Sequence, residues 1–92
     1  MTPESRPQLA AKVRLRLDQK SQGFFMLFPE RGILLNAVAG EIIKRCDGRN
    51  TVTIIVDHLM QIYDDQPRQI IENETLNLLQ QFYARGLIRI ES

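Results

Sequence analysis

The hydrophobic pattern of this chain changes its period once, near residue 36, and that change limits the folds open to it. Before it, Val13, Leu15 and Leu17 alternate with polar neighbours, a pattern typical of a half-buried strand. An apolar run from Phe24 to Phe28 and a short run from Ile33 to Leu35 follow, set apart by the polar stretches QKSQG and PERG. Three neighbouring strands joined by short turns predict an antiparallel meander.

From Asn36 onward the period is helical. Asn36 can cap a first helix that ends at Asp47-Gly48, and Thr51 can cap a second helix. A third helix is expected from about Gln69 to Arg85, closed by Gly86, and the following LIRI offers a short terminal strand. The second helix carries apolar residues at spacings of three and four: Val52, Ile55, Val56, Leu59, Met60 and Tyr63.

The order of these elements predicts an α+β fold, an N-terminal three-stranded antiparallel β-meander followed by three α-helices. Residues 1–11 are expected to form a polar lead-in, and residues 12–92 a single domain. Ninety-two residues suit one small domain. No signal peptide and no apolar run of about 20 residues is present, so we expect a cytoplasmic protein with no membrane partner.

The residues that usually carry catalysis or bind metal are few. The chain has one cysteine, Cys46, and one histidine, His58, too few for a zinc site of four Cys/His ligands. Cys46 falls on the apolar face of the first helix and is expected to be a small core residue, while His58 falls off the apolar stripe and is expected to be solvated. Asp64-Asp65 is expected to be a solvated loop pair. We therefore predict no enzyme, no metal site and no cofactor.

A helix–turn–helix DNA reader is one alternative, because the first two helices flank a tight turn. The second helix, TVTIIVDHLMQIYDD, has no Lys or Arg to read base edges, and the net charge is only +1. Lys44, Arg45 and Arg49 lie near the turn, where contact with a DNA backbone is conceivable, but such contacts give little sequence specificity. DNA recognition is the second choice, and we expect no nucleic-acid partner.

The pattern favours a peptide-binding slot instead. In a meander, the last strand, Ile33–Leu35, lies at an edge with unpaired backbone groups that an extended chain could bind. The third helix is apolar on more than one line: Leu76, Leu79 and Tyr83 could face a groove while Leu78 and Phe82 face the core, or the reverse. The same edge strand could also pair with a second copy, so a homodimeric scaffold remains an alternative.

Two segments, FPERGILLNAVAGEIIKRCDGRNTVTIIVDHL and LNLLQQFYARGLI, resemble the PqqD family. The resemblance runs from Val13 to Ile90, and its most specific elements, in order, are Pro29-Glu30, Leu35-Asn36, Cys46-Asp47-Gly48 and Thr51-Val52.

The resemblance implies a winged-helix-like peptide-recognition domain that acts as a peptide chaperone in pyrroloquinoline quinone (PQQ) biosynthesis. It implies two partners: the precursor peptide PqqA, bound as an added strand, and the radical SAM enzyme PqqE, which cross-links a Glu and a Tyr of that peptide. The slot implied lies between the third strand and the third helix. Its expected residues here are Gly32, Ile33, Leu34, Leu35, Glu74, Leu76, Leu79 and Tyr83, with Arg31 and Glu74 as charged rim residues that set the direction of the guest.

Four positions depart from the family pattern. Phe24 or Phe25 stands where relatives often carry Trp, and Ala37 stands where an acidic residue often follows Leu-Asn. Ile54 replaces the Glu of the second helix's first turn, which removes a reciprocal capping box and leaves an isoleucine expected to be exposed. Glu74-Thr75 replaces the familiar Asp-Val before the leucine pair of the third helix.

Overall fold

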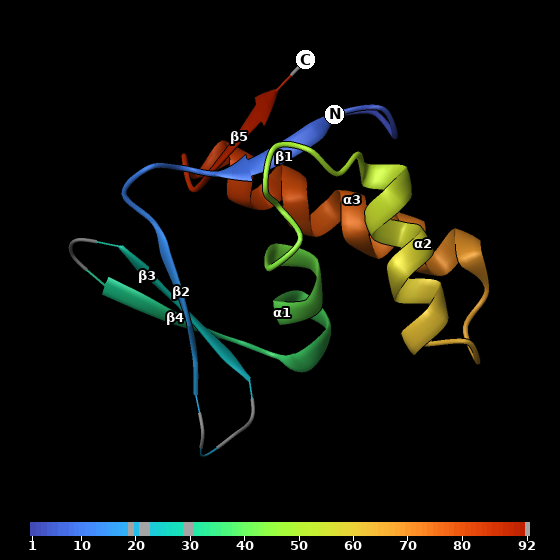
Figure 1. The fold of residues 1–92 in the computed structure, drawn as a ribbon, viewed down its shortest axis with the longest axis horizontal. Helices are drawn as coiled ribbons and strands as arrows, with labels where there is room; N and C mark the ends of the chain where they lie inside the picture. The colour runs from blue at the N-terminus through green and yellow to red at the C-terminus, as the bar shows by residue number, and fades with distance from the viewer. Residues whose placement is uncertain (19, 21–22, 29–30, 92) are drawn as a thin grey trace.

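The computed structural model describes residues 1–92 except 19, 21–22, 29–30 and 92 (Figure 1). It has three helices and two antiparallel sheets, which confirms the predicted α+β class. The elements, in chain order, are β1 (Arg6–Leu9), β2 (Arg14–Leu17), β3 (Phe24–Phe28), β4 (Arg31–Leu35), α1 (Ala37–Ile43), α2 (Val52–Ile62), α3 (Arg68–Ala84) and β5 (Ile88–Glu91).

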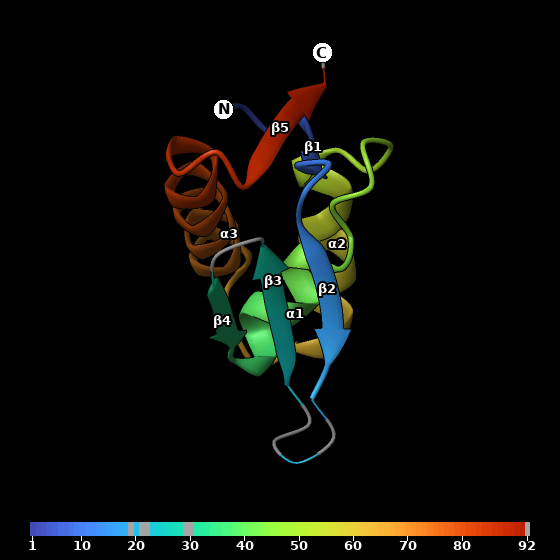
Figure 2. The same ribbon diagram turned by 90° about the vertical axis from the view of Figure 1, so that its left-hand side faces the viewer.

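The predicted meander is the three-stranded sheet β2–β3–β4, with β3 in the centre. Helix α1 lies behind one face of this sheet, whereas no helix lies over the face turned to the viewer in Figure 2. Met26 of β3 points to the α1 side and is fully buried. Leu17, expected on the buried face, is 55% exposed, because it lies at the end of β2. Val13, which precedes β2 on the same face, lies in the core. The predicted turns at QKSQG and PERG include residues outside the described part of the chain.

Residues 1–11 are the main correction to the sequence reading, since they are not a separate lead-in. Strand β1 pairs antiparallel with β5, with Arg6 opposite Glu91 and Leu9 opposite Ile88. Pro7 within β1 is fully buried. The strand is only four residues long and contains a proline, and its partner lies at the other end of the chain, where no local pattern points to it.

The first residues of the chain also cap α2. The amide N–H groups of Val52 and Thr53 donate to the carbonyl oxygens of Ser5 and Pro3, each at 3.0 Å. The side-chain oxygen of Thr51 accepts from the N–H of Ile54, as its predicted capping role requires. These bonds satisfy the N–H groups of Val52, Thr53 and Ile54, donors that a helix N-terminus leaves free, so the first turn is capped without the reciprocal half of a capping box. Ile54 is 39% exposed, as predicted.

Helix α1 is shorter than predicted. Its cap is as expected, with Oδ1 of Asn36 accepting from the N–H of Ala39 at 2.8 Å. The helix ends at Ile43 rather than at Asp47, because the next turn tightens: the N–H of Cys46 donates to the carbonyl of Ile43, three residues back. Gly48 then takes a φ of +80°, a conformation that suits glycine.

The core lies between α1, α2, α3 and the inner face of the three-stranded sheet. The predicted stripe of α2 is confirmed for Val52, Ile55, Val56 and Leu59, all buried, while Met60 and Tyr63 pack at its margin. The core is formed by these hydrophobic residues: Ala10, Val13, Met26, Leu35, Ile42, Ile43, Cys46, Val52, Ile55, Val56, Leu59, Ile71, Leu79, Phe82, Leu87 and Ile88.

Candidate functional site: a free strand edge and an adjoining pocket

Strand β4 is an edge strand, as predicted, and the direction of its backbone groups follows from the register of the sheet. The N–H of Asp18 donates to the carbonyl of Gly23 at 2.8 Å, next to the first β2–β3 pair. The N–H and C=O groups of successive residues alternate sides along a strand. Those of Phe25 and Leu27 therefore point to β2, like those of Gly23, and those of Phe24, Met26 and Phe28 point to β4. The β4 residues paired with the β3 residues that point to β4 are Arg31, Ile33 and Leu35.

It follows that Gly32 and Leu34 carry their N–H and C=O groups on the free side of β4. In the described part of the chain, no hydrogen bond from another segment reaches these two residues. Such a row of unpaired donors and acceptors is the template on which another extended chain can pair. Of the predicted edge residues, then, Gly32 and Leu34 offer backbone groups, whereas Ile33 and Leu35 use theirs within the sheet.

The side chains of β4 divide in the same way. Leu35 is only 4% exposed and belongs to the core, and Ile33 is half-buried against it. Leu34 is 52% exposed. The side chain of Leu35 is therefore not available to a peptide, and Leu35 only marks the end of the edge strand.

The remaining predicted site residues lie on helix α3 and differ in how far they are exposed. Glu74 and Tyr83 are exposed, and Leu76 is half-buried. Leu79 has no exposed surface, so the prediction that its side chain faces a groove is wrong.

The core-facing line of α3 is formed by four residues at spacings of three and four: Ile71, Thr75, Leu79 and Phe82. The sequence reading missed this line because Thr75 is polar. Its hydroxyl donates to the carbonyl of Ile71 at 2.7 Å and is thereby satisfied inside the core.

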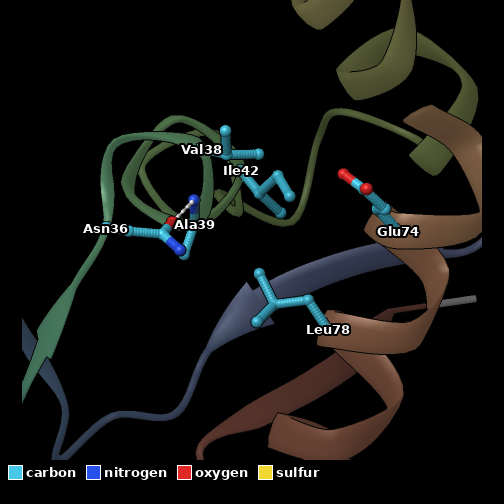
Figure 3. Close-up of a pocket in the computed structure, with 6 residues that line it drawn as sticks. All are labelled: Asn36, Val38, Ala39, Ile42, Glu74 and Leu78. Atoms are coloured by element: carbon cyan, nitrogen blue, oxygen red, sulfur yellow. Dashed lines mark hydrogen bonds between the residues drawn. The ribbon is translucent and has the colours of Figure 1, made fainter. Parts of the chain in front are cut away.

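A pocket of about 310 Å³ lies between α1 and α3, at the end of β4 (Figure 3). Leu78 and Glu74 extend from α3 toward α1, where Val38 and Ile42 face them. The residues that line it are Asn36, Val38, Ala39, Ile42, Glu74 and Leu78. Only Glu74 among them was predicted as a site residue. Leu78 belongs to the alternative in which the other line of α3 faces outward.

The carboxylates near this region differ in their surroundings. Glu74 lies at an apolar pocket wall and is exposed. Glu41 of α1 accepts from Arg45 at 2.7 Å and from Lys44 at 3.0 Å. Burial alone would raise the pKa of Glu41, but the hydrogen bonds from Arg45 and Lys44 outweigh burial and hold that pKa below its usual value.

These ion pairs bear on the DNA alternative, since two of the three cations near the turn are engaged by Glu41. On the exposed side of α2, Asp57 pairs with Arg68 of α3 at 2.7 Å. The helix that would have to read bases therefore presents a carboxylate bound to its neighbour. Both observations weigh against a DNA-reading surface here.

The residues considered for catalysis lie apart from the pocket. Cys46 is buried, as predicted, and burial raises the pKa of its thiol to about 12, which keeps it neutral and unreactive. His58, Asp64 and Asp65 are exposed. Within the described residues, no group of three or more Cys, His, Asp or Glu side chains is arranged to hold a metal ion. Likewise, none of the helices described there is long and apolar enough to span a bilayer.

Comparison with known proteins gives a consistent result. Residues 23–88 match the family described as coenzyme PQQ synthesis protein D (PqqD). A Methylococcus capsulatus protein named PqqA binding protein is 32% identical over 89 residues, which cover 97% of this chain and 92% of that protein. The bifunctional coenzyme PQQ synthesis protein C/D of Methylorubrum extorquens is 42% identical over 73 residues, 79% of this chain but 19% of that longer protein.

A solved structure shows the same fold. It is the solution NMR structure of the PqqD truncation of Methylobacterium extorquens PqqCD, described as a functional, stand-alone recognition element for ribosomally synthesized and post-translationally modified peptides (RiPPs). The TM-score is 0.76 at 36% identity, and the match covers 90% of this chain and 87% of the other. The fold is thus that of a RiPP recognition element. Within that class, the chain belongs to the PqqD family.

Proposed function

We propose that this protein binds the precursor peptide PqqA by β-strand addition at β4 and presents it to the radical SAM enzyme PqqE for PQQ biosynthesis. The protein itself carries out no chemistry in this scheme. The single observation that carries the proposal is the free backbone edge at Gly32 and Leu34, next to a pocket. The names of the relatives add the identity of the peptide.

Backbone pairing would supply affinity and register. The N–H and C=O groups of Gly32 and Leu34 are two residues apart, which is the spacing at which an antiparallel or parallel guest strand exchanges hydrogen bonds. A guest that pairs with them extends the three-stranded sheet by one strand.

Side-chain selectivity would come from the pocket at the end of the edge. Val38, Ile42 and Leu78 offer an apolar wall for one guest side chain, and burying apolar surface there favours binding. Glu74 at the same wall would favour a basic or hydroxyl group beside that side chain. Arg31 lies at the opposite end of β4 and would favour a guest carboxylate, so the two charges oppose a reversed guest.

Delivery of the bound peptide raises its effective concentration at the enzyme. A second copy of this protein, by contrast, would compete for the same edge, because β4 can pair with only one strand on its free side. Peptide binding is therefore expected to dissociate any dimer formed through β4.

The edge is tested by removing one outward N–H. Leu34→Pro should weaken PqqA binding about 10-fold or more, because it removes a donor facing the guest. Leu34→Ala is the matched control, since it shortens the same side chain but keeps the N–H, and it should bind within about 3-fold of the wild type. Isothermal titration calorimetry measures both, after circular dichroism has shown that each variant is folded.

Hydrogen exchange on the unaltered protein provides a second measurement. The amides of Gly32 and Leu34 should exchange quickly in the free protein and slowly with saturating PqqA, while the amide of Ile33 stays slow in both states. Unchanged exchange at Gly32 and Leu34, or unchanged affinity in a folded Leu34→Pro variant, would contradict strand addition at this edge.

A further inference from the structure

The outer face of the three-stranded sheet is the side turned away from α1. Alternation along the strands places six residues on it, in two rows across the sheet: Arg16, Phe25 and Leu34 in one, and Arg14, Leu27 and Gly32 in the other. Figure 2 looks onto this face, and no helix covers it. Its apolar residues lie next to one another, since Phe25 pairs across strands with Leu34 and Leu27 lies two residues from Phe25 along β3.

The charge on this face is mostly positive, since two arginines lie on it and one carboxylate, Asp18, follows Arg16 at the next outward position. Arg14 and Arg16 are both exposed, and β2, β3 and β4 contain no Asp or Glu. Arg14 donates to the backbone carbonyls of Ala11 and Val13. Arg16 makes no ion pair with any residue that the structure describes. Apolar side chains bordered by cations fit a protein surface whose apolar residues are bordered by carboxylates.

A second copy of the chain fits this face poorly. Among the described residues, two copies packed face to face would bring four arginines, Arg14 and Arg16 of each copy, into one interface against two Asp18 carboxylates. Like charges brought together in this way oppose association. The charge pattern therefore favours a different, acidic partner.

The outer face is also continuous with the proposed peptide site. Leu34 directs its backbone to the free edge and its side chain onto this face. A guest strand beside β4 would extend the same pleated surface, with every second guest side chain next to Leu34 and Gly32. A partner on this face would then contact protein and guest together.

We propose that the outer face is the docking surface for the radical SAM enzyme, through an acidic and partly apolar patch of that enzyme, and that the bound peptide completes the surface. This inference rests on the proposed function. It assigns the enzyme to the sheet face and the peptide to the sheet edge. Because the two ligands share one surface, each raises the affinity of the other by the same factor.

Charge reversal at one arginine tests the assignment. Arg16→Glu should weaken enzyme binding about 10-fold or more and leave PqqA binding within about 2-fold of the wild type. Arg49→Glu is the control, because Arg49 is also exposed but lies in the turn between α1 and α2, outside the three-stranded sheet, and it should leave both affinities unchanged. Biolayer interferometry with purified enzyme, with and without saturating PqqA, measures each affinity.

The outcomes separate this inference from the proposed function. Enzyme binding that is equally sensitive to Arg16→Glu and Arg49→Glu, or insensitive to both, overturns the docking face. Enzyme binding that PqqA does not strengthen overturns the shared surface. Failure of the wild type to bind PqqA at all would instead overturn the proposed function. Sedimentation showing that Arg16→Glu dissociates a dimer would assign the face to a second copy and so overturn the inference as well.

Discussion

The two sheets of this protein differ in how they are held. The β1–β5 sheet joins opposite ends of the chain and is tied to its surroundings on several sides: the N–H of Ala10 donates to Leu87 and that of Gly48 to Pro7, each at 3.0 Å. The β2–β3–β4 sheet is built from consecutive hairpins, with one face packed on α1 and the other open.

This difference separates two tasks. The small sheet closes the domain, because a strand from each end of the chain must be in place before its pairing exists. The larger sheet can leave an edge unpaired and a face uncovered without weakening the hydrophobic core, since the residues on its inner face are already packed. Residues of the small sheet are therefore expected to govern stability, and outward residues of the larger sheet to govern binding.

The largest contrast is expected between one apolar residue of each sheet. Ile88→Ala in β5 should lower the free energy of unfolding by about 2–5 kcal/mol, because Ile88 is 2% exposed and its truncation leaves a cavity. Leu34→Ala in β4 should change the free energy of unfolding by no more than about 0.5 kcal/mol, because that side chain is largely solvated. Urea denaturation followed by circular dichroism measures both. Equal losses would break the distinction between the sheets.

Two glycines sharpen the contrast at the level of the backbone. Gly48, bonded to β1, has a φ of +80°, so Gly48→Ala should cost about 1–2 kcal/mol of stability. Gly32 in β4 has no such φ, and an added Cβ would meet the flexible end of Leu27 at 3.0 Å and the backbone oxygen of Met26 at 3.7 Å, an ordinary contact distance. Gly32→Ala is therefore expected to cost less than about 0.5 kcal/mol. Thermal denaturation of the two variants gives the comparison, and a larger loss for Gly32→Ala would contradict it.

The smallest expected effect is on the loss of stability at acidic pH. The backbone N–H groups of Asn50 and Arg49 donate to Asp47, beside β1, and they lower the pKa of its carboxyl. A carboxyl with a lowered folded-state pKa adds stability above its unfolded pKa of about 3.9, and that stability is lost as pH falls through the folded-state pKa. Asp47→Asn should therefore lose less stability than the wild type between pH 6 and pH 3. Urea midpoints at the two pH values test this, and parallel losses would exclude a role for Asp47.

The sequence predicted the parts of the fold that local patterns encode. The alternation of Val13 and Leu15, the cap at Asn36 and the apolar stripe of α2 all depend on neighbours within a few residues, and each is found as expected. Strand β1 was missed because its partner is β5, at the far end of the chain.

The candidate site was predicted only in part, for a related reason. The edge position of β4 follows from the order of the strands, and it is confirmed. Which line of α3 faces inward depends on its packing against α2, and Thr75 fits inside the core only because its hydroxyl bonds to Ile71. Leu79, four residues after Thr75, lies on the same inward line and is a core residue, whereas Leu78 lines the pocket. A helix with apolar residues on two lines does not encode this choice in its own period.

The pairing of β1 with β5 brings the two ends of the chain together, at the side of the molecule away from β4 (Figure 1). Another domain can therefore be fused to either end, or the ends joined and the chain reopened elsewhere, without obstructing the guest edge. The longer Methylorubrum extorquens relative, in which the matching segment is a small fraction of a larger polypeptide, fits such modular use.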